Sequence, residues 1–486
     1  MSPLDIGNET QLVIDQTAVR EARGIAWTLH PAKKHPENPI LTADLPTDGW
    51  RVLLYGDVFY DEDECIYKMW YRGNEGQAWP RGGLRYATSE DGVHWEKPNV
   101  GTLRSDLYPV HNVVHDQAIS GGVLKDPRDP DASRRYKMVT FMQGDRGYHT
   151  LVSRDGLVWE RLSIEPICRA DDRIDDIITA WYDERLGRYV ALAKINAHVR
   201  GHRRRVFWLT TSEDFEHWTE PKLVFYPDAA DDASSLARIE QVRTLLDRPD
   251  DPALMRTEFY GVTAYPAGAC TVAFPWMLTI NNDARYGSHE GPGEIQIAFS
   301  RDLERWQRPF RTPCVPRGKI GEWDCGWFAS QSRALRVGDE VWLYYSGANH
   351  THGAPCIKRA EGTGRGTQFT GSIGLATWEL DRFASADAPQ EGGTLTTPPL
   401  RFEGSRLEVN ARVAEGGSLV VRPLDAVGGP IASWPASDPV HGDALRHGVT
   451  WNGRRDIGAL AGRPVVLRFE MVAAELFAFQ VRSDAV

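Results

Sequence analysis

Short segments in which hydrophobic and polar residues alternate recur along most of the chain, and each runs into a tight turn. Four of them are followed by the same phrase, Ser-x-Asp-x-x-x-Trp, at residues 89–95, 153–159, 212–218 and 300–306. A fifth alternating segment, 373–377, precedes a degenerate copy at 378–383. Alternation with a period of two predicts β-strands, and a phrase repeated in this way predicts a fold built from repeated units.

A second predicted strand, rich in aromatic and β-branched residues, stands before each phrase. These return strands lie at 67–71, 136–140, 189–193, 271–275 and 341–345. Each follows a hairpin turn, so the unit is a four-stranded antiparallel meander present five times. Radial repetition of such sheets, without long helices between them, predicts an all-β, five-bladed β-propeller. The repeated Ser and Asp are interpreted as tying the turn by local hydrogen bonds, and the Trp as packing between blades.

The propeller is expected at residues 45–383, with a rim insertion at 228–255 that contains a short helix. Residues 1–44 are expected to pack on the propeller as strands, of which 12–15 and 25–29 close the ring against the last blade.

Beyond the propeller, residues 384–394 are polar and predict a linker. Alternating segments follow it and predict a small C-terminal β-sandwich over 395–486.

Composition and charge narrow the range of partners. The formal net charge of −11 argues against a nucleic acid or an anionic membrane, because both are bound through a basic surface. A carbohydrate remains compatible with this charge, and the oligomeric state stays open. Without a leader-like start or an apolar run of membrane-spanning length, the chain is expected to be cytoplasmic. The six cysteines are scattered without C-x-x-C spacing, so neither a zinc site nor a disulfide framework is predicted.

The segments Tyr67–Gly73 and Tyr86–Pro98, together with the third phrase, resemble the five-bladed propeller glycosidases of families 32, 43, 62, 68 and 117 and their family-32-like relatives. The resemblance covers nearly the whole chain, including a C-terminal segment similar to the β-sandwich of family 32. It implies a glycoside hydrolase that works without a cofactor. The W-x-N-D-P-N-G opening of true family 32 fructosidases is not found, which argues against fructan as the substrate.

Glycoside hydrolysis needs a group that protonates the leaving oxygen and a carboxylate that attacks the anomeric carbon or activates water. In the first blade the resemblance favours Asp57 as nucleophile or base, with Asp48 as the alternative. In the third blade Asp176 resembles the acid that opens this strand in relatives. Its neighbour Asp175 is expected to face the opposite way, because successive side chains alternate across a strand. In the fourth blade Glu258 is the preferred general acid, since apolar neighbours raise the pKa of a carboxyl group.

Other polar and aromatic residues are candidates for binding substrate. They are Asp48, Trp50, Arg72, Glu322, Trp323, Asp324, His350 and His352. An indole flanked by acids suits a sugar, whose ring stacks while its hydroxyls form hydrogen bonds. His352 lacks the spaced partners of a metal ligand, so no metal site is predicted. The basic run 200–205 is interpreted as a solvated hairpin tip, or, if it faces the pocket, as a site for an anionic sugar or phosphate.

Three functions fit these patterns: a hydrolase of a furanoside or related glycoside, with transglycosylation as a variant; a phosphorolytic enzyme resembling family 130; and a glycan-binding propeller without activity. For the first, Asp57, Asp176 and Glu258 are expected to converge on one axial pocket, with Glu258 protonated. Replacing Asp57 with Asn is then expected to abolish activity.

Overall fold

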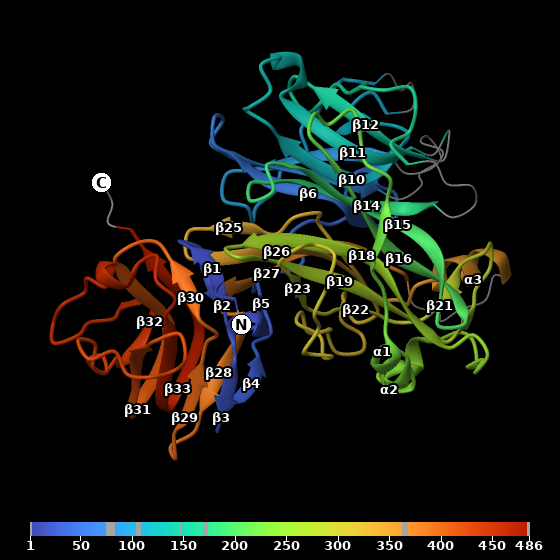
Figure 1. The fold of residues 1–486 in the computed structure, drawn as a ribbon. Helices are drawn as coiled ribbons and strands as arrows, with labels where there is room; N and C mark the ends of the chain where they lie inside the picture. The colour runs from blue at the N-terminus through green and yellow to red at the C-terminus, as the bar shows by residue number, and fades with distance from the viewer. Residues whose placement is uncertain are drawn as a thin grey trace.

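The computed structural model describes residues 2–73, 83–103, 108–142, 144, 147–168, 174–361 and 368–483 (Figure 1). The predicted five-bladed propeller is present, and its blades follow one another along the chain. Blade 1 consists of β6 (Val52–Asp61), β7 (Ile66–Gly73), β8 (Leu84–Ser89) and β9 (Val113–His115). Blade 2 consists of β10 (Ala118–Lys125), β11 (Tyr136–Met142), β12 (Gly147–Ser153) and β13 (Glu160–Arg161). Blade 3 consists of β14 (Ile174–Asp183), β15 (Arg188–Val199), β16 (His202–Ser212) and β17 (Lys222–Phe225).

The last two blades contain interrupted strands. Blade 4 has β18 (Arg256–Ala267) and β19 (Cys270–Ile280), and its next strand is divided into β22 (Gly293–Ile295) and β23 (Ala298–Ser300). Blade 5 has β24 (Trp327–Ser330) and β25 (Leu335–Val337) along β26 (Glu340–Ala348), followed by β27 (Gly371–Glu379). The ring is closed by β5 (Lys33–Lys34), which pairs with β27. The last blade therefore takes its outermost strand from the N-terminal part of the chain.

The repeated phrase forms the turn expected of it. In blade 2 the Oγ of Ser153 accepts a hydrogen bond from the backbone N–H of Gly156 at 2.9 Å. The carboxylate of Asp155 accepts the N–H groups of Leu157 and Val158, and the phrases of the other blades repeat this carboxylate pattern. The preceding blade also binds the turn, since Trp70 of blade 1 donates its indole N–H to the carbonyl of Gly156 at 2.8 Å.

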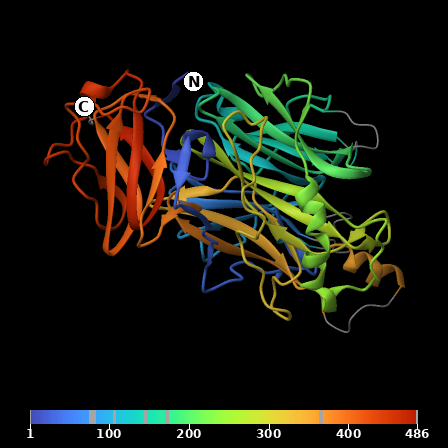
Figure 2. The same ribbon diagram turned by 60° about the horizontal axis from the view of Figure 1, so that its bottom comes forward.

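The two N-terminal segments expected to close the ring, 12–15 and 25–29, do not pair with the last blade. In an eight-stranded sheet, β2 (Gln11–Leu12), β3 (Glu21–Arg23) and β4 (Ala26–Leu29) pair with C-terminal strands (Figure 2). Those strands are β28 (Ala384–Ala388), β29 (Gly393–Thr396), β31 (Arg406–Leu424), β32 (Gly442–Gly448) and β33 (Val466–Arg482). The expected linker is thus largely strand, because Ala384, Ala386 and Ala388 alternate into the core. Beside this sheet, β1 (Leu4–Gly7) pairs in parallel with β30 (Leu400–Phe402).

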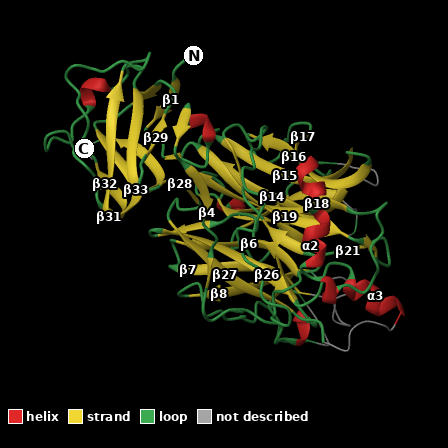
Figure 3. Ribbon diagram, turned by 90° about the horizontal axis from the view of Figure 1, so that it is seen from below, coloured by secondary structure: helices red, strands yellow, loops and turns green. Residues whose placement is uncertain are grey.

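Helices are few and short. The rim insertion holds α1 (Ala229–Ala233) and α2 (Ser235–Glu240) in place of the single helix expected there. Asp231 anchors the insertion, since its buried carboxylate pairs with Arg308 at 2.5 Å. The third helix, α3 (Ala354–Glu361), lies with α2 on the side of the propeller away from the C-terminal sheet (Figure 3). Among the described residues, no helix is both long and apolar enough to cross a membrane.

Candidate functional site

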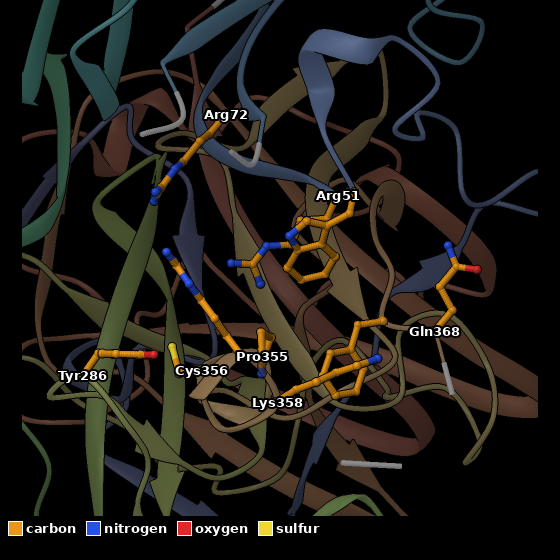
Figure 4. Close-up of a pocket in the computed structure, with 10 residues that line it drawn as sticks. Arg51, Arg72, Tyr286, Pro355, Cys356, Lys358 and Gln368 are labelled. Carbon is orange, nitrogen blue, oxygen red and sulfur yellow. The ribbon is translucent and has the colours of Figure 1, made fainter. Parts of the chain in front are cut away.

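Two adjoining cavities lie where the inner strands of the blades begin. The inner cavity has a volume of about 100 Å³, and its lining includes Asp176, Tyr55, Tyr260, Trp327, His350 and His352. The outer cavity has a volume of about 540 Å³, and its lining includes Arg51 and Arg72 together with Pro355, Cys356 and Lys358 of α3 (Figure 4). Arg51, Arg72, Pro355 and Cys356 line both, so the two cavities form one continuous site. No described residue of the C-terminal sheet contributes to either.

Irregular pairing of the inner strands decides which side chains reach this site. Along β14, Ile174 pairs with Ile195 and Ile178 with Ala193, so four steps on one strand match two on its partner. Such a bulge re-aims neighbouring side chains. Asp175 and Asp176 consequently both contact Lys194, at 3.5 and 2.6 Å. The expectation that they face opposite ways was wrong, because it assumed a regular strand.

Three carboxylates near the inner cavity are joined by two cations. Asp176 and Asp175 share Lys194, and Asp175 also pairs with Arg205 at 2.9 Å. Arg205 in turn pairs with Glu258 at 2.6 Å. Burial raises the pKa of Asp175, but the charges of Lys194 and Arg205 outweigh it and hold this pKa well below its usual value. The result is a row of alternating charges in which the Asp176 carboxylate lines the cavity.

Glu258 is fully buried and joins the row from β18. Burial alone raises its pKa, but Arg205 and Arg256 outweigh burial and hold the pKa below its usual value. The guanidinium Nε–H of Arg256 donates a hydrogen bond to the Glu258 carboxylate at 2.8 Å. The prediction of a protonated Glu258 was therefore wrong. Its neighbour Phe259 packs instead into a hydrophobic cluster between blades, so it does not supply the apolar surroundings that were expected.

Aromatic rings form much of the inner wall. The ring of Tyr260 lies 4.8 Å from Trp327, and the ammonium of Lys194 lies 3.7 Å from the Tyr260 ring centre. Burial, with a smaller contribution from the nearby Asp176 carboxylate, raises the pKa of Tyr55 to about 12, so this phenol stays protonated. His352 contacts the carbonyl of His289 through Nδ1 at 2.7 Å, and a carbonyl can only accept, so Nδ1 carries the proton. Burial holds the pKa of His352 far below its usual value, leaving a neutral ring.

Asp57 lines neither cavity. It follows a second irregularity, in which Leu53 pairs with Arg72 and Asp57 with Trp70. Its carboxylate is completely buried and lies 3.5 Å from the guanidinium of Arg333. Burial raises the pKa of Asp57 to about 7, and Arg333 offsets only part of this rise. The structure thus brings Asp176 and Glu258 into one charged row and leaves Asp57 out of it.

Several candidate binding residues have structural contacts instead. Asp48 is buried and accepts hydrogen bonds from Tyr71 at 3.0 Å and Lys97 at 2.6 Å. Asp324 pairs with Lys34 of the closing strand at 2.6 Å. Two further candidates, Trp323 and Glu322, are neighbours of Asp324 in the sequence. The ring of Trp323 stacks on Tyr345, and the carboxylate of Glu322 accepts the backbone N–H of Lys319. These four side chains line neither cavity.

Trp50, Arg72, His350 and His352 do line the two cavities, and their binding of substrate stays a prediction. Sequence reasoning missed Arg51, Lys194, Tyr55 and Tyr260. Tyr55 and Tyr260 stood beside the acids that were considered, but no repeat or spacing marked them. The basic run was only partly solvated: Arg205 belongs to the charged row, and Arg204 is buried against Asp232 at 2.6 Å.

No family model matches this chain, and no curated protein matches it. Solved structures do. A thermostable family-43 glycoside hydrolase is 10% identical, with 73% of this chain and 95% of that chain covered and a TM-score of 0.45. A β-1,2-mannobiose phosphorylase from Listeria innocua, in complex with β-1,2-mannobiose, is 13% identical, with coverage of 72% and 98% and a TM-score of 0.44. An N-acetylgalactosamine deacetylase from F. plautii, in complex with blood group B trisaccharide, is 14% identical, with coverage of 74% and 96% and a TM-score of 0.41.

Metal ligands are not grouped in the part of the chain that the structure describes: no set of three or more His, Cys, Asp or Glu side chains is placed to hold an ion. His352 therefore has no such partners among the described residues.

Proposed function

We propose that this chain is a carbohydrate-active enzyme that cleaves the glycosidic bond of a furanoside or related glycoside at the inner cavity. The observation that carries the proposal is Asp176, the one carboxylate among the described residues that line the two cavities. It stands beside aromatic rings that suit the apolar face of a sugar.

Asp176 is assigned the role of base or nucleophile. Its carboxylate accepts a hydrogen bond from Lys194 at 2.6 Å, which fixes its position at the wall of the cavity. From there it can take a proton from an attacking water or attack the anomeric carbon itself. Transfer to a sugar acceptor would use the same carboxylate.

Glu258 is assigned an indirect role. With its pKa lowered by two arginines, it is a poor proton donor, and it acts as a positioning residue that holds Arg205. The protonated hydroxyls of Tyr55 and Tyr260 also line the inner cavity, where they can donate a hydrogen bond to the leaving oxygen and pass it a proton as the glycosidic bond breaks. Asp57 is proposed to have a role in the structure of the propeller and no contact with the substrate.

Phosphorolysis is a second candidate. Arg51 and Arg72 line both cavities, and Arg72 lies 3.9 Å from the Asp176 carboxylate. Guanidinium groups this close to the Asp176 carboxylate could hold a phosphate in position to attack the anomeric carbon. Only one protein carboxylate is needed when phosphate replaces water as the nucleophile.

The test is a screen of chromogenic furanosides and pyranosides with and without inorganic phosphate, followed by NMR of the first-formed anomer. Cleavage that is lost in Asp176→Asn and kept in Glu322→Gln supports the proposal, since Glu322 is exposed and lines neither cavity. A sugar 1-phosphate as product selects phosphorolysis. Glycan binding without cleavage of any glycoside would contradict the enzymatic proposal and favour a binding propeller.

A further inference from the structure

The outer cavity has a charge opposite to that of the whole protein. Four cationic side chains are among its ten lining residues: Arg51, Arg72, Lys358 and Arg359. No acidic residue is among those ten, although the chain carries a net charge of −11. A local excess of positive charge in an acidic protein attracts an anion to that place.

Arg51 is the most informative of these cations. Its Nε is buried and has no hydrogen-bond partner, and within the described part of the chain Arg51 forms no ion pair. Its guanidinium lies against the Trp50 ring, 4.4 Å from the ring centre. Burial, together with the charge of Arg72, lowers the pKa of Arg51. A buried charge is costly when no neighbouring group neutralises it, and none of the described residues pairs with Arg51, so this arrangement favours binding of an anionic partner.

Arg72 completes a pair of guanidiniums. Its Nε is also buried without a hydrogen bond, and its ion pair with Asp176 is long, at 3.9 Å. In Figure 4 Arg51 and Arg72 enter the site from the same side, opposite Tyr286 and Cys356. Two guanidinium forks facing one space suit a planar or tetrahedral oxyanion.

The size and walls of the cavity indicate what carries the oxyanion. A volume of about 540 Å³ is that of a site for an organic ligand, far more than a free phosphate fills. The rings of Trp50 and Phe369 both pack near the His350 ring, with centres 5.7 and 4.8 Å from it. Lys358 lies 4.8 Å from the centre of the Phe369 ring. Arg51 and Lys358 lie over the Trp50 and Phe369 rings, so the wall combines aromatic surface with positive charge, as suits a sugar unit that bears an acidic group.

We infer that the outer cavity binds a sugar unit carrying a carboxylate or sulfate group, through Arg51 and Arg72, so that the substrate is an acidic glycan. The inference rests on the proposed function, because the cavity is then the subsite next to the bond that Asp176 attacks. The basic groups select the substrate, and the inner cavity performs the reaction.

Binding is tested with galacturonic acid oligosaccharides and with the matched neutral galactose oligosaccharides, by titration calorimetry on the full chain. We expect the acidic ligand to bind at least tenfold more tightly and its affinity to fall with added salt. Arg51→Met removes this preference. Lys358→Met, on the exposed face of α3, reduces it and guards against a folding defect in the first variant. Arg305→Met, with a side chain 89% exposed, leaves it unchanged.

Inorganic phosphate is titrated in parallel. Phosphate binding that depends on Arg51, without any preference for acidic oligosaccharides, overturns the inference and identifies a free anion as the ligand. Equal affinity for acidic and neutral oligosaccharides overturns it as well. The same titrations with Asp176→Asn separate the two proposals. Acid preference without cleavage by the wild type means that only the proposed function fails, and cleavage of neutral glycosides without acid preference means that only this inference fails.

Discussion

Glu258 and Asp57 are both fully buried carboxyl groups on inner strands, and their surroundings move their pKa values in opposite directions. Glu258 lies within hydrogen-bond distance of two guanidiniums, which lower its pKa despite burial. Asp57 has Arg333 at 3.5 Å, and burial raises its pKa to about 7. Burial therefore does not fix the charge of an acid in this channel; the number and closeness of its cations do. The charged row holds its carboxylates with close cations, and Asp57 stands apart from the row with a longer ion pair to Arg333.

The largest expected difference between the charged row and Asp57 is the effect of a substitution on catalytic activity. Asp176→Asn should lower kcat/KM on the order of 10³-fold, because the amide cannot act as base or nucleophile. Asp57→Asn should stay within a few-fold of the wild type, since Asp57 lines neither cavity. Both are measured on the glycoside that the screen identifies, with circular dichroism to verify folding. A complete loss of turnover in a folded Asp57→Asn protein would restore Asp57 to the catalytic set.

The next effect concerns the stability of the charged row. Glu258→Gln leaves Arg205 and Arg256 buried without the carboxylate that joins them, and should lower the free energy of unfolding by about 3–5 kcal/mol. Urea denaturation at pH 7 measures the change, and Glu322→Gln serves as the exposed control. A loss below about 1 kcal/mol would mean that the row relaxes into other pairings.

The effect at Asp57 is a dependence of stability on pH, and it has a definite sign. Its folded pKa of about 7 lies above the ordinary value of 3.8, so between these pH values the folded state holds a proton that the unfolded state has released. Its contribution to the free energy of unfolding therefore falls as pH rises from about 4 to about 7, by up to roughly 1.4 kcal/mol per pH unit. Asp57→Asn should remove this slope and be more stable than the wild type at pH 8, relative to pH 5. Identical pH profiles of the two proteins in urea denaturation would refute the raised pKa.

The parts of the fold that the sequence predicted correctly depend on neighbours along the chain. Ser153 and Asp155 form their hydrogen bonds within three residues, so the structure of the turn is determined by residues of the phrase itself. The turns and the five blades follow from such local patterns, and that is why the repeat identified the propeller.

The site depends on distant pairings instead. The bulge in β14 determines whether Asp175 faces Lys194, and no residue in that strand predicts a bulge from the sequence. Glu258 was assigned from Phe259 and Tyr260 next to it, but its pKa depends on Arg205, 53 residues away in the chain. The same applies to strand assignment, since the segment around Trp27 pairs with β28 across more than 350 residues. Local reasoning therefore identified the correct strands and placed some of their side chains wrongly.

The smallest effect is expected at the rim, where the structure is local. Ser153→Ala removes the acceptor of the Gly156 N–H, which lies in the left-handed region with a φ of 77°, and it should cost about 1 kcal/mol. The Asp155 carboxylate still holds the N–H groups of Leu157 and Val158, so the turn keeps its shape and the cost stays small. Urea denaturation of Ser153→Ala is compared with Arg154→Ala, whose side chain is exposed in the same turn. Since Ser212 accepts the N–H of Phe215 at the same distance of 2.9 Å, Ser212→Ala should give the same value within a few tenths of a kcal/mol, and activity per folded molecule should not change. A loss above about 3 kcal/mol, or very different losses at the two turns, would show that these turns are coupled to the channel and are not local.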